Sequence, residues 1–269
     1  MPLDTTIGFL GYGNMGQAIL EGLIRTGVMR PAQATVYDVA PACCEAAIRL
    51  GVRVAASEAA LAQDCDTLVL AVKPQMMAQA LEAARPGVRP GLRVVSIAAG
   101  ISIRFLQERL GPGVRVIRVM PNTPALVGVG AAGIALAADC TDVDRAVARV
   151  LFEAVGIAVF VAEKDLDAVT ALSGSGPAYF FHMVECMTQA AVAEGLDMDT
   201  AARLATQTLL GAGTLLAGSG EAAATLRQKV TSKGGTTEAA LRHLAEGGFP
   251  ELIGGAIRAA AARSRELGA

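Results

Sequence analysis

Short apolar runs and alanine-rich helical segments alternate over the first part of the chain, up to residue 164. The apolar runs predict β-strands at 6–10, 34–38, 52–55, 67–72, 92–98 and 114–120. Residues 14–26 and 41–50 have the three- and four-residue spacing of helices, and Gly27 is expected to end the first of them. Strands that alternate with helices predict a parallel, doubly wound sheet with right-handed crossovers.

The pattern changes near residue 165, where the strand signals stop. Helical spacing is found at 168–196, 200–217, 221–230, 238–245 and 251–267. The sequence therefore predicts an α/β domain over 1–164, followed by an all-helical domain over 165–269. The helical half is apolar over wide arcs, so we expect this surface to be buried between subunits of a homo-oligomer.

Composition narrows the class of protein. The 269 residues are 53% hydrophobic and 18% charged, with a formal net charge of −2, so a packed core is expected and nucleic acid is not an expected partner. The mean hydropathy of +0.46 raises the question of a membrane, but the long uncharged stretch 119–138 is interrupted by Pro121 and Pro124. We therefore expect no membrane partner.

Cysteine and histidine usage points the same way. The five cysteines form no CxxC pair, and with only two histidines a zinc or other metal site is not expected. The first residues include Asp4 and carry no basic segment, so they do not resemble a signal peptide. The sequence thus predicts a soluble cytoplasmic protein.

A glycine-rich turn, GYGNMG, directly follows the first predicted strand and begins the first helix. Gly11 allows a tight turn, Gly13 lets a pyrophosphate approach the backbone, and Gly16 lets helix and strand pack closely. Asn14 and Met15 lie in the first helical turn, whose free N–H groups face a phosphate. We interpret the motif as a Rossmann-type dinucleotide site; the alternative is a purely structural turn.

Asp38 ends the second predicted strand, where a carboxylate accepts hydrogen bonds from the ribose hydroxyls and repels a 2′-phosphate. This favours NADH over NADPH only weakly, so the cofactor stays open between the two. The alternative role of Asp38 is a turn or helix cap.

Three further motifs follow predicted strands at the edge where such sheets bind ligands. AVKP lies at the carboxyl end of the fourth strand, SIAAG ends the fifth and MPNTP ends the sixth. At this edge Lys73 is expected to meet a phosphate or ribose, and the small residues Ala98 and Ala99 leave room for a flat nicotinamide ring.

The segment VTSKGGTTEAAL (230–241) places hydroxyl side chains around two glycines just before a helix. Ser232, Gly235, Thr236 and Thr237 then form a pocket of hydroxyls and backbone N–H groups that suits an anion. An ordinary helix cap is the alternative. In ALSGSGPAY (171–179), Pro177 is expected to kink the helix.

Reduction of a ketone would need a proton donor for the alkoxide that forms, and the sequence offers no obvious one. No Lys or Arg occurs between Leu166 and Ala202, and His182 is expected to be a packed side chain. A protonated cyclic imine already carries positive charge, so hydride transfer neutralises it and the site must mainly orient the substrate and hold its carboxylate.

Taken in order, GYGNMG, AVKP, SIAAGI, MPNTP, ALSGSGPAY and SxGGTT strongly resemble the pyrroline-5-carboxylate reductase family over essentially the whole chain. The resemblance implies NAD(P)H-dependent reduction of 1-pyrroline-5-carboxylate to L-proline, the last step of proline biosynthesis. It also implies a helical dimerisation domain and homodimers that can assemble into decamers. By this resemblance Ser232, Gly235, Thr236 and Thr237 would hold the substrate carboxylate, and the Thr237 hydroxyl would be the catalytic contact to the ring nitrogen. The resemblance also implies that six residues surround the cofactor, namely Ala71, Val72, Lys73, Pro74, Ala98 and Ala99.

Two positions depart from the family pattern. Lys233 stands where the family usually has proline, which makes the loop less stiff and adds a positive charge. Glu58 stands near the adenosine end where asparagine is common, and with Asp38 it argues against an NADPH preference.

Other functions remain as alternatives. A β-hydroxyacid dehydrogenase would carry a catalytic lysine where this chain has Phe180, which counts against that class. A related imine reductase or a non-catalytic dinucleotide-sensing protein are the others, and the intact SxGGTT loop argues against the last.

Overall fold

The computed structural model describes residues 5–268, and contacts divide the chain into two compact units. One unit holds the chain up to Ser175 together with the segment from Ala260 onward, and the other is Gly176–Ala259. The first unit thus extends beyond the strand-containing region, because the helical segment after residue 165 packs on the sheet: Leu166 is buried, and the Ser264 hydroxyl donates a hydrogen bond of 2.6 Å to Asp167.

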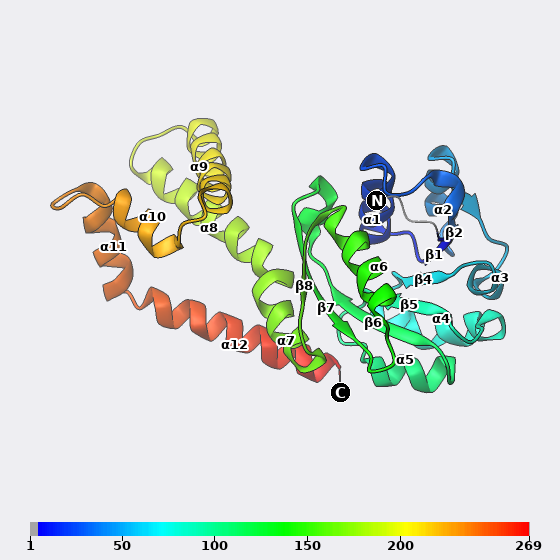
Figure 1. The fold of residues 1–269 in the computed structure, drawn as a ribbon. Helices are drawn as coiled ribbons and strands as arrows, with labels where there is room; N and C mark the ends of the chain where they lie inside the picture. The colour runs from blue at the N-terminus through cyan, green and yellow to red at the C-terminus, as the bar shows by residue number, and fades with distance from the viewer. Residues whose placement is uncertain (1–4, 269) are drawn as a thin grey trace. The chain divides into compact units, whose positions relative to one another are not determined.

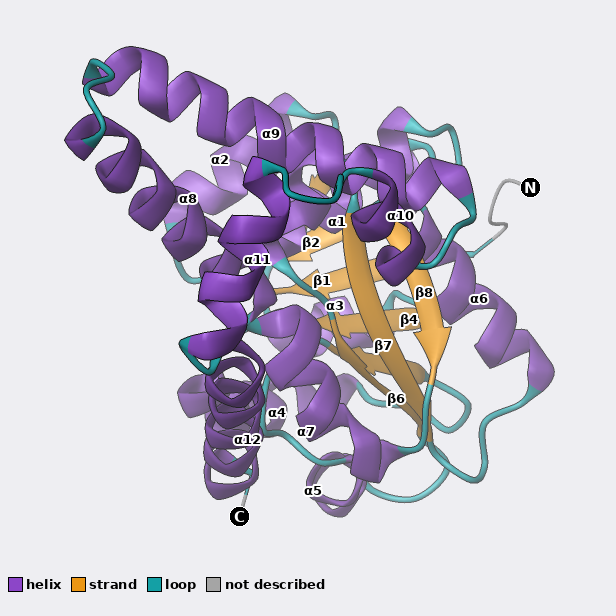
Figure 2. Ribbon diagram, turned by 90° about the vertical axis from the view of Figure 1, so that its left-hand side faces the viewer, coloured by secondary structure: helices purple, strands orange, loops and turns teal. Residues whose placement is uncertain are grey.

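The first unit is built on one eight-stranded sheet of order β3-β2-β1-β4-β5-β6-β7-β8 (Figures 1 and 2). All neighbouring strands are parallel except β6 and β7. The direction of strand progression reverses beside β1, which pairs with both β2 and β4, and this is the place where doubly wound sheets bind ligands. The strands are β1 (Ile7–Leu10), β2 (Ala34–Tyr37), β3 (Arg53–Val54), β4 (Thr67–Leu70), β5 (Arg93–Ser96), β6 (Arg115–Met120), β7 (Gly130–Leu136) and β8 (Gly156–Phe160).

Strands β7 and β8 were not predicted from the sequence, and β7 departs from the parallel pairing that was predicted for the sheet. This strand has the sequence GAAGIAL, whose glycines and alanines give no strand signal, and it pairs antiparallel with β6. Residues 121–129, which include the 3₁₀ turn η4 (Thr123–Val127), connect β6 to β7, and a parallel crossover needs a longer connection.

Helices cover both faces of the sheet, as a doubly wound fold requires. Two apolar clusters contain the inward side chains: α1 and α6 pack on one face through Leu20 and Phe152, and α3 to α5 pack on the other through Leu61 and Leu106. The helices of this part are α1 (Asn14–Arg25), α2 (Pro41–Arg49), α3 (Glu58–Gln63), α4 (Met77–Ala84), α5 (Ile103–Leu110), α6 (Asp142–Glu153) and α7 (Leu166–Val169).

A buried ion cluster joins the amino ends of three strands to α6. The Arg93 guanidinium donates to Asp144 at 2.7 Å and to the Thr67 hydroxyl at 2.8 Å, and Arg115 lies 3.4 Å from the other carboxylate oxygen of Asp144. The Asp144 side chain is fully buried and also accepts from the backbone N–H and hydroxyl of Thr141 in a capping box. The cluster lies away from the ligand edge and serves to fix α6 on the sheet.

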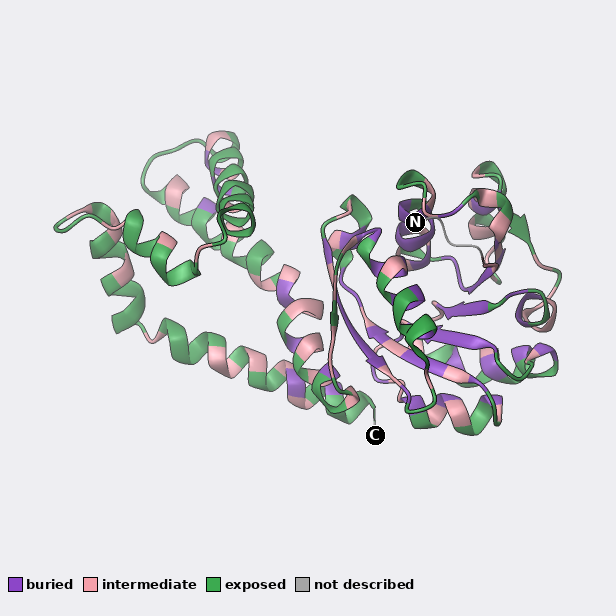
Figure 3. Cartoon of the chain, in the orientation of Figure 1, coloured by how far each residue is buried: buried purple, intermediate pink, exposed green. Residues whose placement is uncertain are grey.

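The second unit is helical and exposes most of its surface (Figure 3). Its helices are α8 (Gly176–Ala193), α9 (Met198–Ser219), α10 (Ala223–Lys229), α11 (Thr236–Glu246) and the first part of α12 (Phe249–Leu267), and α8 packs along α9. Large apolar side chains are exposed along these helices, among them Phe181, Met187, Leu204, Leu210 and Leu252. Within residues 5–268, each helix is too short or too polar to span a lipid bilayer.

Candidate active site

The glycine-rich turn has the geometry that its spacing predicts. Gly11 has φ +92°, and a Cβ there would lie 2.8 Å from the backbone of Ala71 and Val72. A Cβ on Gly16 would lie 2.9 Å from the Gly11 carbonyl oxygen, so this glycine allows α1 to approach the turn. In contrast, a Cβ on Gly13 would meet nothing within 4 Å, which leaves open space over the backbone at the start of the helix.

That open space faces the amino end of α1. Gly13 caps the helix in an extended conformation and supplies no side-chain hydrogen bond. The N–H groups of Asn14, Met15 and Gly16 therefore have no intrahelical acceptor, because the first helical bond runs from Gln17 N–H to the Gly13 carbonyl at 2.9 Å. Free N–H groups at a helix amino end suit a phosphate, so the residues present fit a dinucleotide.

Tyr12 fixes the turn from within. Its backbone N–H donates to Asp38 at 2.6 Å, and its carbonyl accepts from the Gln17 side chain at 2.9 Å. The ring is buried, and the hydroxyl has no hydrogen-bond partner among the described residues. Burial, with smaller contributions from Glu21 and Cys43, raises the pKa of Tyr12 to about 12, so the hydroxyl stays protonated.

We predict that Tyr12→Phe does not destabilise the protein and raises the free energy of unfolding by about 1 kcal/mol, because a buried unpaired hydroxyl costs that order of free energy. Urea unfolding monitored by circular dichroism measures the difference. A loss of stability in the variant would show that the hydroxyl has a bound partner.

The Asp38 carboxylate stabilises the turns beside it, which was the alternative to a contact with the ribose. One carboxylate oxygen accepts from Tyr12 N–H and the other from Ala40 N–H at 2.8 Å, so Asp38 ties the glycine turn to the segment after β2. Each carboxylate oxygen can accept a second hydrogen bond, so a ribose contact is compatible with this role and stays a prediction.

A second carboxylate lies near the same strand end. Glu58 begins α3 and hydrogen-bonds to the Tyr37 hydroxyl; burial and this neighbouring carboxylate, with a smaller effect from Asp38, raise the pKa of Tyr37. The end of β2 is therefore negatively charged, which is unfavourable for a 2′-phosphate.

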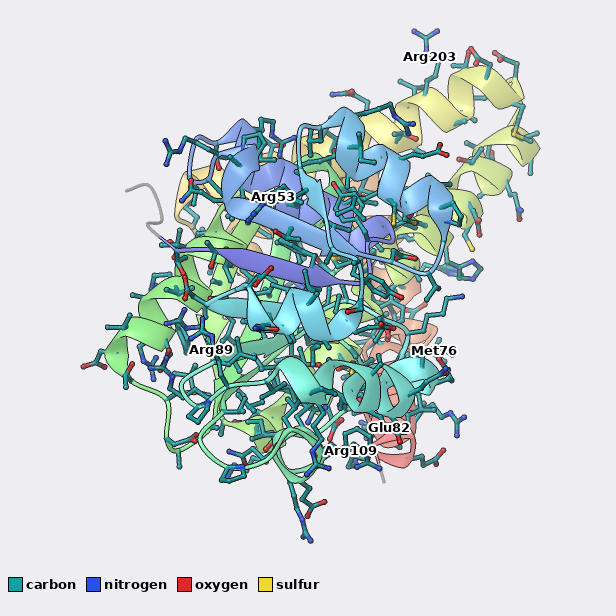
Figure 4. The ribbon with its side chains drawn as sticks, turned by 90° about the vertical axis from the view of Figure 1, so that its right-hand side faces the viewer. Arg53, Met76, Glu82, Arg89, Arg109 and Arg203 are labelled. Carbon is teal, nitrogen blue, oxygen red and sulfur yellow. The ribbon has the colours of Figure 1, made fainter. Side chains whose placement is uncertain are left out.

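Parallel pairing brings the motifs after β1, β4 and β5 to one edge of the sheet. Leu10 pairs with Leu70, and Leu70 pairs with Ser96, so Gly11, Ala71 and the 97–99 segment follow side by side. In Figure 4, the labelled Met76, shortly after Lys73 and Pro74, lies near this carboxyl edge, and Arg89 lies at the opposite edge. Val72 and Ala99 are half-buried, Ala98 is buried and Lys73 is exposed.

The MPNTP motif is tied to ALSGSGPAY through one buried amide. The Asn122 side chain donates to the Ser173 carbonyl at 3.0 Å and accepts from Ala131 N–H at 2.8 Å. In an uninterrupted helix the Ser173 carbonyl would accept from the residue at 177, but Pro177 has no N–H. A π-helical turn, Thr170–Gly174, precedes α8, which has Pro177 in its first turn, so the helical hydrogen bonding is irregular where the kink was predicted. Sequence reasoning gave Asn122 no role, although the missing proline N–H implied a free carbonyl.

His182 differs from expectation, because its side chain on α8 is largely exposed and lies 3.2 Å from Glu185. Among the described residues, no group of three His, Cys, Asp or Glu side chains could hold a metal ion.

The SKGG segment forms a tight turn within the helical unit. Gly235 N–H donates to the Ser232 carbonyl at 3.0 Å, and Gly234 has φ +72° while no residue other than glycine has positive φ in the described chain. These features define a type II turn with Lys233 at its second position. A Cβ on Gly235 would meet the Ser232 hydroxyl, so a larger residue there would require the Ser232 side chain to move.

The turn presents the amino end of α11. Gly235 caps this helix without a side chain, so the N–H groups of Thr236 and Thr237 have no intrahelical acceptor. Thr236 is exposed and Thr237 is half-buried. The structure therefore brings Ser232, Gly235, Thr236 and Thr237 together in one donor-rich segment. Sequence reasoning missed Glu238, whose carboxylate accepts from Gly234 N–H at 2.7 Å; a glutamate in the first helical turn was the available signal.

Comparison with known proteins gives the family. The pyrroline-5-carboxylate reductase of Pseudomonas aeruginosa is 43% identical over 263 residues, which cover 97% of this chain and 96% of that protein. The chain belongs to the pyrroline-5-carboxylate reductase family. The model for pyrroline-5-carboxylate reductase dimerisation matches residues 163–267, and a model described as NADP oxidoreductase coenzyme F420-dependent matches residues 6–100.

Solved pyrroline-5-carboxylate reductases share the fold. The structure from Coxiella burnetii has a TM-score of 0.94 at 34% identity, covering 99% of this chain and all of that one. The Plasmodium falciparum structure, with NADP bound, has a TM-score of 0.87 at 28% identity and covers 100% of both chains. These comparisons confirm the predicted reductase family, the fold class and the oxidoreductase activity, and the dimerisation model supports self-association.

Proposed function

We propose that this chain reduces 1-pyrroline-5-carboxylate to L-proline through the residues placed above. The observation that carries the proposal is the SxGGTT segment, a type II turn that presents a hydroxyl and free N–H groups at the amino end of α11. Such a segment suits the carboxylate of a small substrate. The glycine turn at Gly11–Gly16 suits a dinucleotide such as the NADP that is bound in the Plasmodium falciparum structure.

Each segment has a separate task in the proposed reaction. The N–H groups of Asn14 to Gly16 bind the pyrophosphate, and the small residues Ala98 and Ala99 leave room for a flat ring at the sheet edge. A bound dihydronicotinamide supplies the hydride. Ser232 and the backbone at 235–237 hold the substrate carboxylate. The Thr237 hydroxyl contacts the ring nitrogen and delivers a proton to it. Orientation suffices for most of the catalysis, because hydride neutralises the protonated imine and creates no new anion.

The direct test uses purified protein with pyrroline-5-carboxylate and either NADH or NADPH, following nicotinamide absorbance. We expect oxidation that depends on the substrate, with proline as product. Cofactor binding without turnover would instead favour the dinucleotide-sensing alternative.

For the cofactor we propose a preference for NADH, supported by the two carboxylates at the end of β2. Asp38→Ser is expected to raise the ratio of kcat/KM for NADPH over NADH by about tenfold, since the carboxylate that repels a 2′-phosphate is removed and a serine can still cap the turn. Steady-state kinetics with both cofactors measure the ratio.

Asp139→Ser is the matched control for this change, because Asp139 is exposed and follows β7 at the opposite edge of the sheet. An unchanged ratio in Asp38→Ser would remove Asp38 from the ribose site.

We further propose a cytoplasmic homodimer that assembles into a decamer. The exposed apolar side chains of α8, α9 and α12 supply surface for such contacts, and the free thiols of all five cysteines suit a reducing compartment. Light scattering on the purified protein gives the subunit number.

A further inference from the structure

The carboxylate of Glu238 lies beside a segment that we propose binds an anion, an arrangement that is electrostatically unfavourable by itself. The hydrogen bond that Glu238 accepts explains why a carboxylate is found there. Glu238 is in the first turn of α11, and its Oε2 accepts from Gly234 N–H at 2.7 Å. This bond joins the helix to the third residue of the type II turn, the one whose φ is +72°.

The bond fixes more than one residue. With Gly234 held, Gly235 N–H points back to the Ser232 carbonyl at 3.0 Å, and the Ser232 hydroxyl lies directly over Gly235. The position of the Ser232 hydroxyl relative to the free N–H groups of α11 therefore depends on the conformation at Gly234.

Lys233 makes this dependence stronger. The second position of a type II turn favours proline, whose ring fixes φ near the required value. Lysine leaves φ free, and the two glycines that follow have the greatest backbone freedom of any residues. No hydrogen bond within residues 5–268 uses the Lys233 N–H, so a proline at this position would lose nothing.

We propose that Glu238 is a positioning residue: by holding Gly234 N–H it keeps the turn closed, so that Ser232 and the amino end of α11 converge on the substrate carboxylate. The hydrogen bond from Gly234 to Glu238 restrains the turn, as the ring of a proline at position 233 would by fixing φ. This inference rests on the proposed role of the SxGGTT segment.

The experiment uses substitutions of Glu238 that change its charge and its side-chain length separately. Steady-state kinetics of the full-length protein are measured with 1-pyrroline-5-carboxylate. Glu238→Ala is expected to raise KM for this substrate about tenfold, with KM for the nicotinamide cofactor unchanged and kcat changed less than KM. Glu238→Gln keeps an acceptor and removes the charge, so its KM is expected to equal that of the wild type or fall below it. Glu238→Asp keeps the charge but is one methylene shorter, and its KM is expected to rise.

Rescue separates positioning from general stability. Lys233→Pro added to Glu238→Ala is expected to return KM to within about threefold of the wild type, because proline restores the turn without the carboxylate. Glu246→Ala, at the other end of the same helix, is the matched control and leaves KM unchanged. If Glu238→Ala does not fold, Glu238→Asp with and without Lys233→Pro makes the same test.

Two results would overturn the positioning role: a wild-type KM in Glu238→Ala, or an increase that Lys233→Pro does not reverse. Ser232→Ala distinguishes a wrong role for Glu238 from a wrong assignment of the carboxylate site. If Ser232→Ala leaves the substrate KM unchanged, the proposed carboxylate site is wrong; if it raises KM while Glu238→Ala does not, only the role of Glu238 is wrong.

Discussion

Replacing Asp144 with asparagine is expected to lower the free energy of unfolding by about 3–5 kcal/mol, the cost of leaving a buried charge without its partner. Asp144 is fully buried and faces Arg93 at 2.7 Å and Arg115 at 3.4 Å. The variant keeps the shape of the side chain but leaves these guanidinium groups without an anion. Urea unfolding at neutral pH measures the loss.

The same residue predicts a pH dependence. Burial raises the pKa of Asp144, but hydrogen bonds from Thr141 and Arg93 outweigh it and hold that pKa below its ordinary value. A carboxylate with a lowered folded-state pKa stabilises the protein above its unfolded-state pKa of about 3.9, and this contribution is lost as pH falls through the folded-state value. Wild-type stability should therefore fall in acid more steeply than that of Asp144→Asn.

Asp142→Asn is the control for both measurements, because Asp142 begins the same helix but is exposed. It is expected to cost at most about 1 kcal/mol through the helix dipole. Equal losses in the two variants would show that the ion cluster does not hold α6 on the sheet.

The parts of the fold that could be predicted are those with strong local patterns. The runs at β1, β4, β5 and β6 are rich in branched apolar residues, and the helix after the glycine turn has regular spacing. Strand β7 has no such pattern, because glycine and alanine there leave room for neighbours such as Val169 instead of filling it. Its antiparallel direction depends on the short connection after β6.

The candidate site divides in the same way. The glycine turn and the SxGGTT segment are contiguous in sequence, so their backbone roles could be inferred from residue type alone. One of the two hydrogen bonds of Asp38 joins it to Tyr12 N–H, which is 26 residues away in the sequence, so no local pattern revealed it. The bond between Asn122 and the Ser173 carbonyl spans 51 residues, so Pro177 implied a free carbonyl but no local signal identified Asn122 as its partner.

Thr237→Ala is expected to lower kcat about 100-fold and to leave cofactor affinity near normal, because the Thr237 hydroxyl is proposed to deliver a proton to the ring nitrogen. Thr237 is half-buried in the first turn of α11, and its backbone N–H remains in the variant. The loss is therefore confined to the hydroxyl. Turnover with saturating substrate and cofactor binding followed by fluorescence titration measure the two quantities separately.

Two variants make the result specific to the Thr237 hydroxyl. Thr237→Ser keeps a hydroxyl and should retain most of the turnover, whereas Thr236→Ala removes the exposed neighbouring hydroxyl and should change kcat much less than Thr237→Ala. Because both threonines keep their N–H groups, a difference between them reports on chemistry rather than on carboxylate binding. If cofactor binding collapses in Thr237→Ala while turnover per bound complex stays at the wild-type value, the segment belongs to the cofactor site and the assignment of Ser232–Thr237 to the substrate is wrong.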